Sequence, residues 1–372
     1  MPDPEPLRCL FVLPSFAGGG AERVTLLLAS TMAVHGIASS LVVLDERGPL
    51  HASVPDWLPV KVLHRRRVRQ ALPALARHVA ATQPHVIFSS LDYLSSGLVL
   101  ALFPFRYRPR LVAREANLPS LAYNGPGMAR WMRLVYARCD LVIASSSRMA
   151  GELRERYLVP ADRLVLLNNP VDVTALRRQA QAIPEPALAG LSLCKPGASR
   201  GIYVASGRLV RQKGFDRLLQ CWPAMSAGDQ LVVLGEGPER VGLMRQAEAL
   251  DIAECVHFPG FVPNPWAWYA RADAVLLASR FEGMPNVALE ALACGAPVIA
   301  TPECGGIREL AARSSPDHVR VVPMGRDFIS AMRATRARNA QDPTESRLPA
   351  IYAAETVSAE LARHLIALVR GG

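Results

Sequence analysis

The feature of this sequence that most restricts its fold is the repeated alternation of short, continuous apolar runs with helical segments. In the first half, apolar runs predict strands at 8–16, 39–46, 85–90, 110–116, 141–146 and 163–173. Helical patterns separate them, for example at 21–36, 72–83 and 129–139. Strands that are apolar on both faces need cover on both faces, so the pattern predicts a parallel sheet between two layers of helices.

The second half repeats the alternation. Strands are predicted at 201–209, 230–239, 255–262, 274–280 and 296–302, with helices at 214–225, 240–250, 266–272 and 286–295. A stretch rich in Pro, Gly, Ala and Ser at 179–200 predicts a linker, and 352–370 predicts a final amphipathic helix. We therefore predict an α/β protein with two doubly wound, Rossmann-like domains, residues 1–185 and 186–350, that face each other across a ligand-binding cleft, followed by the helical segment 351–372.

The charge of the chain is unevenly distributed. The formal net charge is +10, and residues 1–180 hold 22 basic against 13 acidic residues, a net of +9. An excess of this kind attracts nucleic acid, an anionic membrane or a phosphorylated substrate, and it also occurs on a solvated surface without a partner. With half of its residues hydrophobic and 20% charged, the composition is that of a globular protein and excludes wholesale disorder.

Cysteine usage indicates a reducing compartment. Seven cysteines occur without a CxxC pair or a histidine cluster, which predicts buried free thiols and no metal site. We find no pattern of a secretory leader, and the apolar runs are shorter than the ~20 residues of a membrane span. The expected location is cytoplasmic, or peripheral on the inner face of the cell membrane.

Three glycine-containing loops follow predicted strands. Gly18, Gly19 and Gly20 precede a helix, whose N-terminus favours an anion. Arg208 and Lys213 follow Gly207, and these cations suit a phosphate group. Gly235 and Gly237 end another strand and permit close approach of a ligand. Each loop is also compatible with an ordinary turn or with solvated cations.

The stretch FEGMPNVALEALACGAPVIA (281–300) contains two carboxylates in an apolar context. Glu282 lies in a loop, Pro285 fits the first turn of a helix, and Glu290 lies one turn further. A carboxylate in such a run is rarely left unpaired, and a carboxylate only accepts hydrogen bonds, which suits a sugar diol. The alternative is a solvated helix carboxylate.

Together these motifs resemble the retaining nucleotide-sugar glycosyltransferases of family 4, which have the GT-B fold. The resemblance covers residues 8 to about 310 and rests on PSFAGGGAERV, GRLVRQKGFD, VVLGEGPE, VHFPGFV and EGMPNVALEALACGAPVIAT, which occur in the family's order. It implies that the final helix crosses back to the first domain. It also implies a front-face mechanism, in which the leaving phosphate helps to deprotonate the acceptor and no protein nucleophile is needed.

The resemblance also implies roles for residues of the second domain. Arg208 and Lys213 hold the donor diphosphate, Glu282 binds the transferred sugar, and these three are the expected catalytic residues. Glu290 binds the donor ribose. The segment near Phe261 and Val262 borders the base. The remaining expected donor-binding residues are Gly207, Gly235, Gly283, Met284, Pro285 and Asn286, with Gly19 and Gly20 of the first domain facing the diphosphate.

The acceptor side departs from the family pattern. Many members carry a histidine where this chain reads VAREANLP, so Arg114, Glu115 and Asn117 are the expected acceptor-side residues. Asp92 and Tyr93 of the preceding loop are further candidates. A structural ion pair of Arg114 is an equal alternative.

We expect no metal and no cofactor. The sequence contains no Asp-x-Asp, the metal–diphosphate ligand of the other large glycosyltransferase fold, and Arg208 with Lys213 would replace a divalent cation. The basic stretches 64–70 and 106–138, where arginines alternate with Tyr107, Trp131 and Tyr136, suit an anionic membrane.

The predicted function is transfer of a hexose or N-acetylhexosamine from a nucleotide diphosphate sugar, with a UDP-sugar favoured, to a glycan acceptor, expected to be lipid-linked, in bacterial surface polysaccharide or glycoconjugate synthesis. A nucleotide-sugar epimerase of the same fold is the alternative, and it would need acid–base residues that are not evident here. A nucleic-acid-binding protein is suggested by charge alone, without a recognition motif, and we expect no nucleic acid partner.

Overall fold

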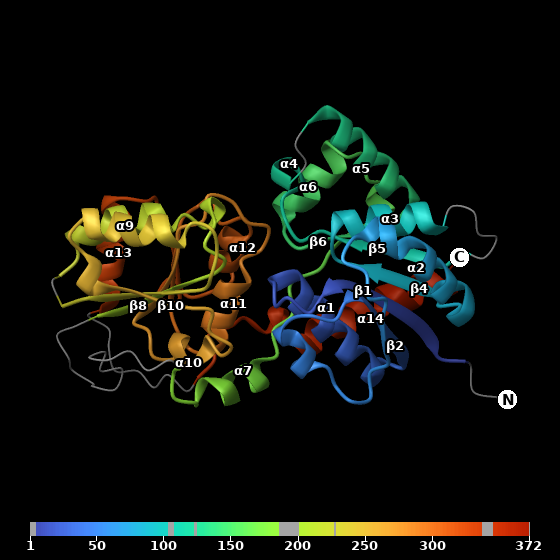
Figure 1. The fold of residues 1–372 in the computed structure, drawn as a ribbon, viewed down its shortest axis with the longest axis horizontal. Helices are drawn as coiled ribbons and strands as arrows, with labels where there is room; N and C mark the ends of the chain where they lie inside the picture. The colour runs from blue at the N-terminus through green and yellow to red at the C-terminus, as the bar shows by residue number, and fades with distance from the viewer. Residues whose placement is uncertain are drawn as a thin grey trace. The chain divides into compact units, whose positions relative to one another are not determined.

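The computed structural model describes residues 5–102, 108–122, 125–185, 201–226, 228–336 and 345–371. The chain divides into two units. Unit 1 contains residues 1–170 and 351–372, and unit 2 contains residues 171–350. Each unit is a parallel sheet with helices on its faces (Figure 1).

Unit 1 contains a seven-stranded parallel sheet in the order β3-β2-β1-β4-β5-β6-β7. Its strands are β1 (Leu7–Ser15), β2 (Ile37–Asp45), β3 (Val60–Val62), β4 (Val86–Ser89), β5 (Arg110–Arg114), β6 (Leu141–Ala144) and β7 (Leu164–Leu166). Its helices are α1 (Gly20–Thr31), α2 (Val68–Thr82), α3 (Asp92–Leu102), α4 (Pro119–Ala122), α5 (Pro126–Arg138), α6 (Ser147–Glu155) and α14 (Ala354–Arg370).

The central strand β1 is apolar on both faces, as the sequence predicts. Phe11 and Leu13 belong to the core that α1 and α14 cover, whereas Leu10 and Val12 belong to the core that α2 and α3 cover. A third core lies between β5 and β6 and the helices α5 and α6. Successive side chains of a strand point to opposite faces, so a continuous apolar run is what a doubly covered sheet requires.

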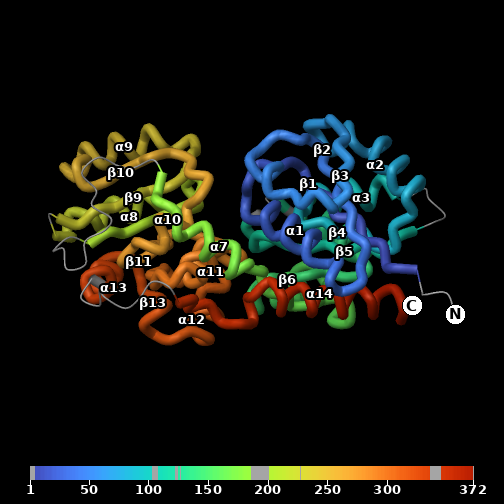
Figure 2. Tube along the Cα trace, turned by 90° about the horizontal axis from the view of Figure 1, so that it is seen from below, coloured from blue at the N-terminus to red at the C-terminus, as the bar shows by residue number. Residues whose placement is uncertain are grey.

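The final helix α14 is part of unit 1, although the whole of unit 2 precedes it in the chain. Its buried residues Val357, Leu361 and Leu365 join the core of β1 and α1. Figure 2 shows α14 as the red helix beneath the strands of unit 1. The amphipathic pattern at 352–370 therefore reflects packing on the unit in which the chain begins.

Unit 2 contains a six-stranded parallel sheet in the order β10-β9-β8-β11-β12-β13. Its strands are β8 (Ile202–Ser206), β9 (Gln230–Leu234), β10 (Val256–Gly260), β11 (Ala274–Leu277), β12 (Val298–Ala300) and β13 (Val319–Val321). Its helices are α7 (Val173–Ala180), α8 (Phe215–Cys221), α9 (Arg240–Ala249), α10 (Trp266–Tyr269), α11 (Asn286–Ala293), α12 (Ile307–Ala312) and α13 (Arg326–Arg336).

The predicted α/β fold with two doubly wound domains is confirmed. The structure adds β3 and β13, whose three-residue sequences VKV and VRV are too short and too polar for the apolar-run criterion. It also divides the chain after Pro170 rather than near residue 185, because α7 packs on α10 and α11 of unit 2. The rest of the expected linker, residues 186–200, lies outside the described residues.

None of the helices in the described ranges is both long and apolar enough to cross a membrane. The apolar helix α3 (Asp92–Leu102) packs within unit 1, because its buried residues Leu94 and Leu98 lie against α2 and the sheet.

Replacement of Leu361 by alanine tests the attachment of α14. The side chain is fully buried, so Leu361→Ala should lower the free energy of unfolding by about 2–5 kcal/mol, measured by denaturant unfolding. Arg363→Ala changes an exposed residue of the same helix and should alter it by less than about 0.5 kcal/mol. Equal stabilities of the two variants would contradict the packing of α14 on unit 1.

Candidate functional site

The motifs of unit 2 lie at one edge of its sheet. Arg208 and Lys213 follow β8, Gly235 follows β9, Phe261 follows β10, and Glu282 follows β11. The strands are parallel, so their carboxyl ends share one edge, which is where doubly wound sheets bind ligands. The predicted donor-binding residues of this unit are thus gathered around one edge of a single sheet.

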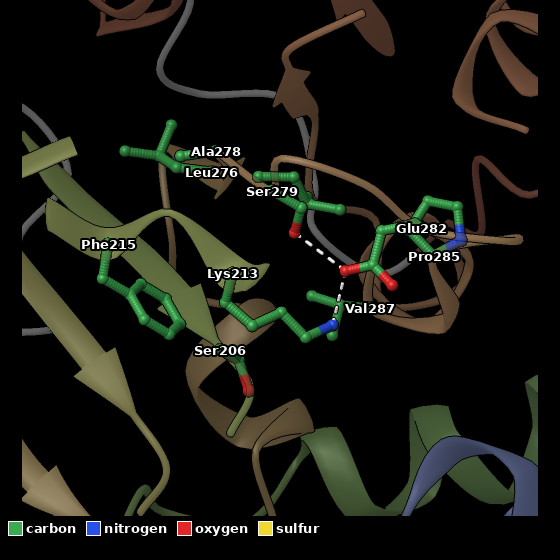
Figure 3. Close-up of a pocket in the computed structure, with 10 residues that line it drawn as sticks. Ser206, Lys213, Phe215, Leu276, Ala278, Ser279, Glu282, Pro285 and Val287 are labelled. Atoms are coloured by element: carbon green, nitrogen blue, oxygen red, sulfur yellow. Dashed lines mark hydrogen bonds and ion pairs between the residues drawn. The ribbon is translucent and has the colours of Figure 1, made fainter. Parts of the chain in front are cut away.

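The centre of the site is an ion pair between Lys213 and Glu282. Lys213 Nζ lies 2.6 Å from Glu282 Oε1, and the hydroxyl of Ser279 donates to the same oxygen at 2.8 Å (Figure 3). The two charged side chains are only 22% and 9% exposed, so water screens their attraction poorly. They face a small pocket lined by Ser206, Lys213, Phe215, Ser279, Glu282, Pro285 and Val287, together with apolar residues of β11.

A tight turn positions Lys213. The chain makes one 3₁₀ turn over Arg211–Lys213 and ends it at Gly214, whose φ is +68°. A Cβ atom at Gly214 would lie 2.0 Å from the carbonyl oxygen of Ala278, so a side chain does not fit between this turn and the end of β11. Glycine at this position therefore allows the lysine-bearing turn to pack directly on the loop that carries Glu282.

Arg280 joins these two loops. Its backbone N–H donates to Gln212 O at 2.7 Å and its Nη1 to Arg211 O at 2.8 Å. Its guanidinium also binds both carboxylate oxygens of Asp216, at 2.7 and 2.6 Å, which lowers the pKa of Asp216 from its ordinary value. We name Arg280, Asp216 and the backbone of residues 211 and 212 the Arg280 latch.

Sequence reasoning missed the Arg280 latch and Ser279. The available signal was the position of Ser279 and Arg280 directly before Glu282, at the end of a predicted strand. A polar pair at that point can reach the neighbouring loop. The sequence does not show which acidic residue it meets, because Asp216 lies 64 residues away along the chain.

A second glycine loop supports the other side of Glu282. Gly305 has a φ of +60°, and a Cβ atom there would lie 2.2 Å from Glu282 O and 2.3 Å from Gly283 O. Gly306 N–H donates to Gly283 O at 2.8 Å. The loop after β12 therefore fixes the backbone of the Glu282–Gly283 turn. This contact was not predicted, although a Gly-Gly pair after a predicted strand is a signal for it.

Glu290 lies one turn into α11, as predicted, and is half-buried. Its Oε2 accepts a hydrogen bond from Trp266 Nε1 at 3.1 Å. Pro285 is in an extended conformation and immediately precedes the helix, which begins at Asn286, so the proline lies just outside the first turn in which it was expected. The segment from Gly283 to Pro285 is buried.

The other predicted residues of unit 2 surround this centre. Arg208 is exposed at the end of β8. The turns at Gly207 and Gly235 pack on each other, because Gly207 N–H donates to Leu234 O at 3.0 Å. Beyond β10, Phe261 is exposed whereas Val262 is buried. Of these side chains, those of Arg208 and Phe261 are accessible to a ligand.

The predicted residues of unit 1 follow β1, β4 and β5. Gly19 is the N-cap of α1, which starts at Gly20, and the Glu22 carboxylate of the first turn lies against Gly19. Asp92 begins α3, and burial raises its pKa. Burial also raises the pKa of the neighbouring Tyr93 to about 12, although its side chain is partly exposed.

The acceptor-side residues differ in accessibility. Arg114 and Glu115 are buried, and only Asn117 is exposed. The guanidinium of Arg114 donates to Asn169 Oδ1, and burial lowers the pKa of Arg114 to about 10. Of the three expected residues, Asn117 is therefore the one whose side chain an acceptor can reach directly.

No three His, Cys, Asp or Glu residues lie together as potential metal ligands in the part of the chain that the structure describes.

Two family models match the chain. Residues 18–175 match Glycosyltransferase Family 4, and residues 200–335 match Glycosyl transferases group 1. The paired doubly wound units, together with these matches, define a glycosyltransferase of the GT-B fold. The chain belongs to glycosyltransferase family 4.

Known relatives agree with this assignment. An uncharacterised glycosyltransferase of Haemophilus influenzae is 34% identical over 81% of this chain and 82% of its own. The N-acetylgalactosamine-N,N'-diacetylbacillosaminyl-diphospho-undecaprenol 4-alpha-N-acetylgalactosaminyltransferase of Campylobacter jejuni is 25% identical over 80% and 81%. The structure of Anabaena HepE in complex with UDP-glucose has a similar fold, with a TM-score of 0.78 and 19% identity over 97% and 99% of the two chains.

Replacement of Gly214 by alanine tests the packing of the lysine-bearing turn. The new Cβ atom would collide with Ala278 O and disfavour the positive φ, so Gly214→Ala should lower the stability of unit 2 by about 2 kcal/mol or more. Denaturant unfolding followed by tryptophan fluorescence, to which Trp222, Trp266 and Trp268 of unit 2 contribute, measures this change.

Gly242→Ala is the matched control. Gly242 lies in α9, and a Cβ atom at this position would have no neighbouring atom within 4 Å, so alanine should raise stability by up to about 1 kcal/mol. A Gly214→Ala protein as stable as the wild type would show that the turn is not packed as described.

Proposed function

We propose that this glycosyltransferase moves a hexose or N-acetylhexosamine from a UDP-sugar to a lipid-linked acceptor in bacterial surface polysaccharide or glycoconjugate synthesis, with retention of configuration and without a metal or cofactor. The observation that carries the proposal is the ion pair between the half-buried Lys213 and the buried Glu282, which lies beside the N-terminus of α11 at the carboxyl edge of the unit 2 sheet.

Lys213 and Arg208 are proposed to bind the donor diphosphate. The ammonium group has three N–H donors, so Lys213 can keep Glu282 and still donate to phosphate oxygens. As the bond to the sugar breaks, negative charge grows on the leaving nucleotide, and a fixed cation in a poorly solvated pocket stabilises that charge more than water does. These cations would then provide the charge stabilisation that a divalent metal provides in other enzymes.

Glu282 is proposed to bind hydroxyls of the transferred sugar. Its Oε1 is held by Lys213 and Ser279, and this fixes the direction in which the carboxylate accepts further hydrogen bonds. Because one oxygen of Glu282 is already bound to Lys213 and Ser279, the carboxylate is better suited to bind sugar hydroxyls than to attack the sugar as a nucleophile. This supports a front-face mechanism, in which the leaving phosphate takes the acceptor proton.

Relatives guide the choice of substrates. A structure with a similar fold contains UDP-glucose, which favours a UDP-sugar donor. The Campylobacter relative is named for a diphospho-undecaprenol acceptor, and other relatives are named for lipopolysaccharide core biosynthesis. These names support a lipid-linked acceptor and a role in surface glycans.

Measurement of nucleotide release from a panel of donors tests the proposal. The panel contains UDP-glucose, UDP-galactose, UDP-N-acetylglucosamine, UDP-N-acetylgalactosamine and GDP-mannose. With the donor that it identifies, Lys213→Ala should lower kcat about 10²-fold or more, because it removes the buried cation. Arg211→Ala removes an exposed cation of the same turn and should retain wild-type kcat. Wild-type turnover in Lys213→Ala, or no binding of any of these donors, would refute the proposal.

A peripheral membrane contact is proposed for α5. Arg130 and Arg133 are exposed on this helix, together with Met128 (47% exposed) and Leu134 (63%). The aromatic residues expected to face the membrane point elsewhere: Tyr136 is buried, and Trp131 donates to Ser96. The exposed apolar groups of α5 are therefore aliphatic side chains.

Three other arginines of the basic stretch 106–138 contribute less to this surface. Arg108 and Arg110 both pair with Asp140, and Arg114 is buried. Arg106 and Tyr107 lie outside the described residues.

Sedimentation with phosphatidylglycerol-containing vesicles tests this contact. The double variant Arg130→Glu, Arg133→Glu should bind about 30-fold or more weakly, because each arginine near such a surface contributes about 1 kcal/mol. The double variant Arg65→Glu, Arg66→Glu changes the other basic stretch by the same charge. Equal loss in both variants would mean that net charge, and not α5, determines binding.

A further inference from the structure

Trp266 is a hydrogen-bond partner of Glu290, the carboxylate to which the family resemblance assigns the donor ribose. Its indole N–H donates to Glu290 Oε2 at 3.1 Å, and both side chains are half-buried. The two residues come from neighbouring helices, α10 and α11. No role for Trp266 follows from the motifs of the sequence.

The position of Trp266 is fixed by the anchoring of α10. Asn264 Nδ2 donates to Gln179 O at 2.8 Å, and Arg271 Nη1 donates to Ala180 O at 3.1 Å, so both ends of α10 are tied to the end of α7. Trp266 is the first residue of this anchored helix and follows the buried Pro265. The backbone at Trp266 is therefore anchored to α7 at residues both before and after the tryptophan.

The same segment carries the residues expected to border the base. The chain leaves β10 at Gly260, passes Phe261 and Val262, and reaches Trp266 four residues after Val262. The hydrogen bond to Glu290 therefore connects the expected base-binding segment with the expected ribose-binding carboxylate.

We propose that Trp266 is a positioning residue, which orients the Glu290 carboxylate toward the ribose hydroxyls and thereby makes the enzyme prefer ribonucleotide donors. This proposal rests on the proposed glycosyltransferase function and on the ribose role that the family resemblance implies for Glu290. The terminal torsion of a glutamate is broad. A hydrogen bond from a rigid indole N–H to one oxygen narrows the range of orientations that the carboxylate adopts.

The chemistry of the indole suits this role. Trp266 can only donate a hydrogen bond, so it does not compete with the carboxylate for the hydroxyl protons of the ribose. A carboxylate offers about four acceptor positions, so Glu290 can hold the indole and still accept from a diol. A phenylalanine would fill similar space without the N–H.

Binding of UDP and 2′-deoxy-UDP to the full chain tests the proposal, because it requires neither the sugar nor the acceptor to be known. Calorimetric titration of Trp266→Phe should give UDP binding that is about tenfold weaker than in the wild type, because the carboxylate must then be oriented at the cost of binding free energy. Binding of 2′-deoxy-UDP, which lacks one of the two hydroxyls, should change by less than about twofold. The preference for the ribonucleotide should therefore largely disappear.

Trp268→Phe is the matched control. Trp268 lies in the same helix, but its indole donates to the backbone carbonyl of Glu185 at 3.4 Å. This variant should keep the wild-type ratio of the two affinities, even if its packing and thermal stability change.

Glu290→Gln distinguishes the positioning role of Trp266 from the ribose-binding role of Glu290. If Glu290→Gln abolishes the preference for UDP while Trp266→Phe keeps it, the role of Trp266 is refuted and that of Glu290 stands. If Trp266→Phe weakens both nucleotides equally, Trp266 contributes packing only, and the inference is refuted. If Glu290→Gln leaves both affinities unchanged, the ribose role of Glu290 fails, and the role of Trp266 fails with it.

Discussion

The arrangement of this site depends on close contact between two loops that lie 69 residues apart along the chain. The Lys213–Glu282 pair forms only because the turn after β8 and the turn after β11 touch without an intervening side chain. Gly214 provides that contact on one side, and Gly305 supports Glu282 on the other. The Arg280 latch then holds the two loops in register through hydrogen bonds to backbone oxygens and to Asp216. The short ion pair therefore results mainly from the packing of the two loop backbones, and the attraction between the charges contributes less to bringing the loops together.

The sequence was sufficient to predict the fold, because a doubly wound sheet leaves a strong periodic signal in its strands and helices. It also brought Lys213 and Glu282 to one edge, because their loops follow parallel strands of one sheet, whereas Glu290 was assigned to the same site by the family resemblance. It could not predict that Trp266 contacts Glu290, that Asp216 binds Arg280 or that Gly305 packs on the backbone of Glu282. Each of these contacts depends on how neighbouring loops are oriented. The expectation that Tyr136 accompanies the arginines at a membrane surface was wrong for a related reason: the sequence does not show which face of α5 is buried, and Tyr136 lies in the core. Arg114 and Glu115 likewise fall where the sequence placed them, but they are buried.

The choice of lysine at position 213 has a physical explanation. The sequence contains only three lysines, at 61, 195 and 213, and otherwise uses arginine for its basic residues. A guanidinium is broad and planar, whereas an ammonium on an unbranched stem is compact. The stem of Lys213 passes close to Gly207, where a Cβ atom would lie 3.2 Å from Lys213 Cε. The narrow space beside the turn after β8 therefore suits lysine, and its rarity in the chain is a signal that sequence reasoning did not use.

The return of α14 to unit 1 has a consequence for biosynthesis. Unit 2 interrupts unit 1 in the chain, and the helix that completes the core of β1 and α1 is made only after the whole of unit 2. While the ribosome translates residues 171–350, the apolar surface that Val357, Leu361 and Leu365 later cover has no native partner. Domains generally fold as units during synthesis, and exposed apolar surface at that stage favours aggregation. The first 170 residues of unit 1 must therefore wait until α14 has been translated, and during this interval we expect the nascent protein to depend most on chaperones.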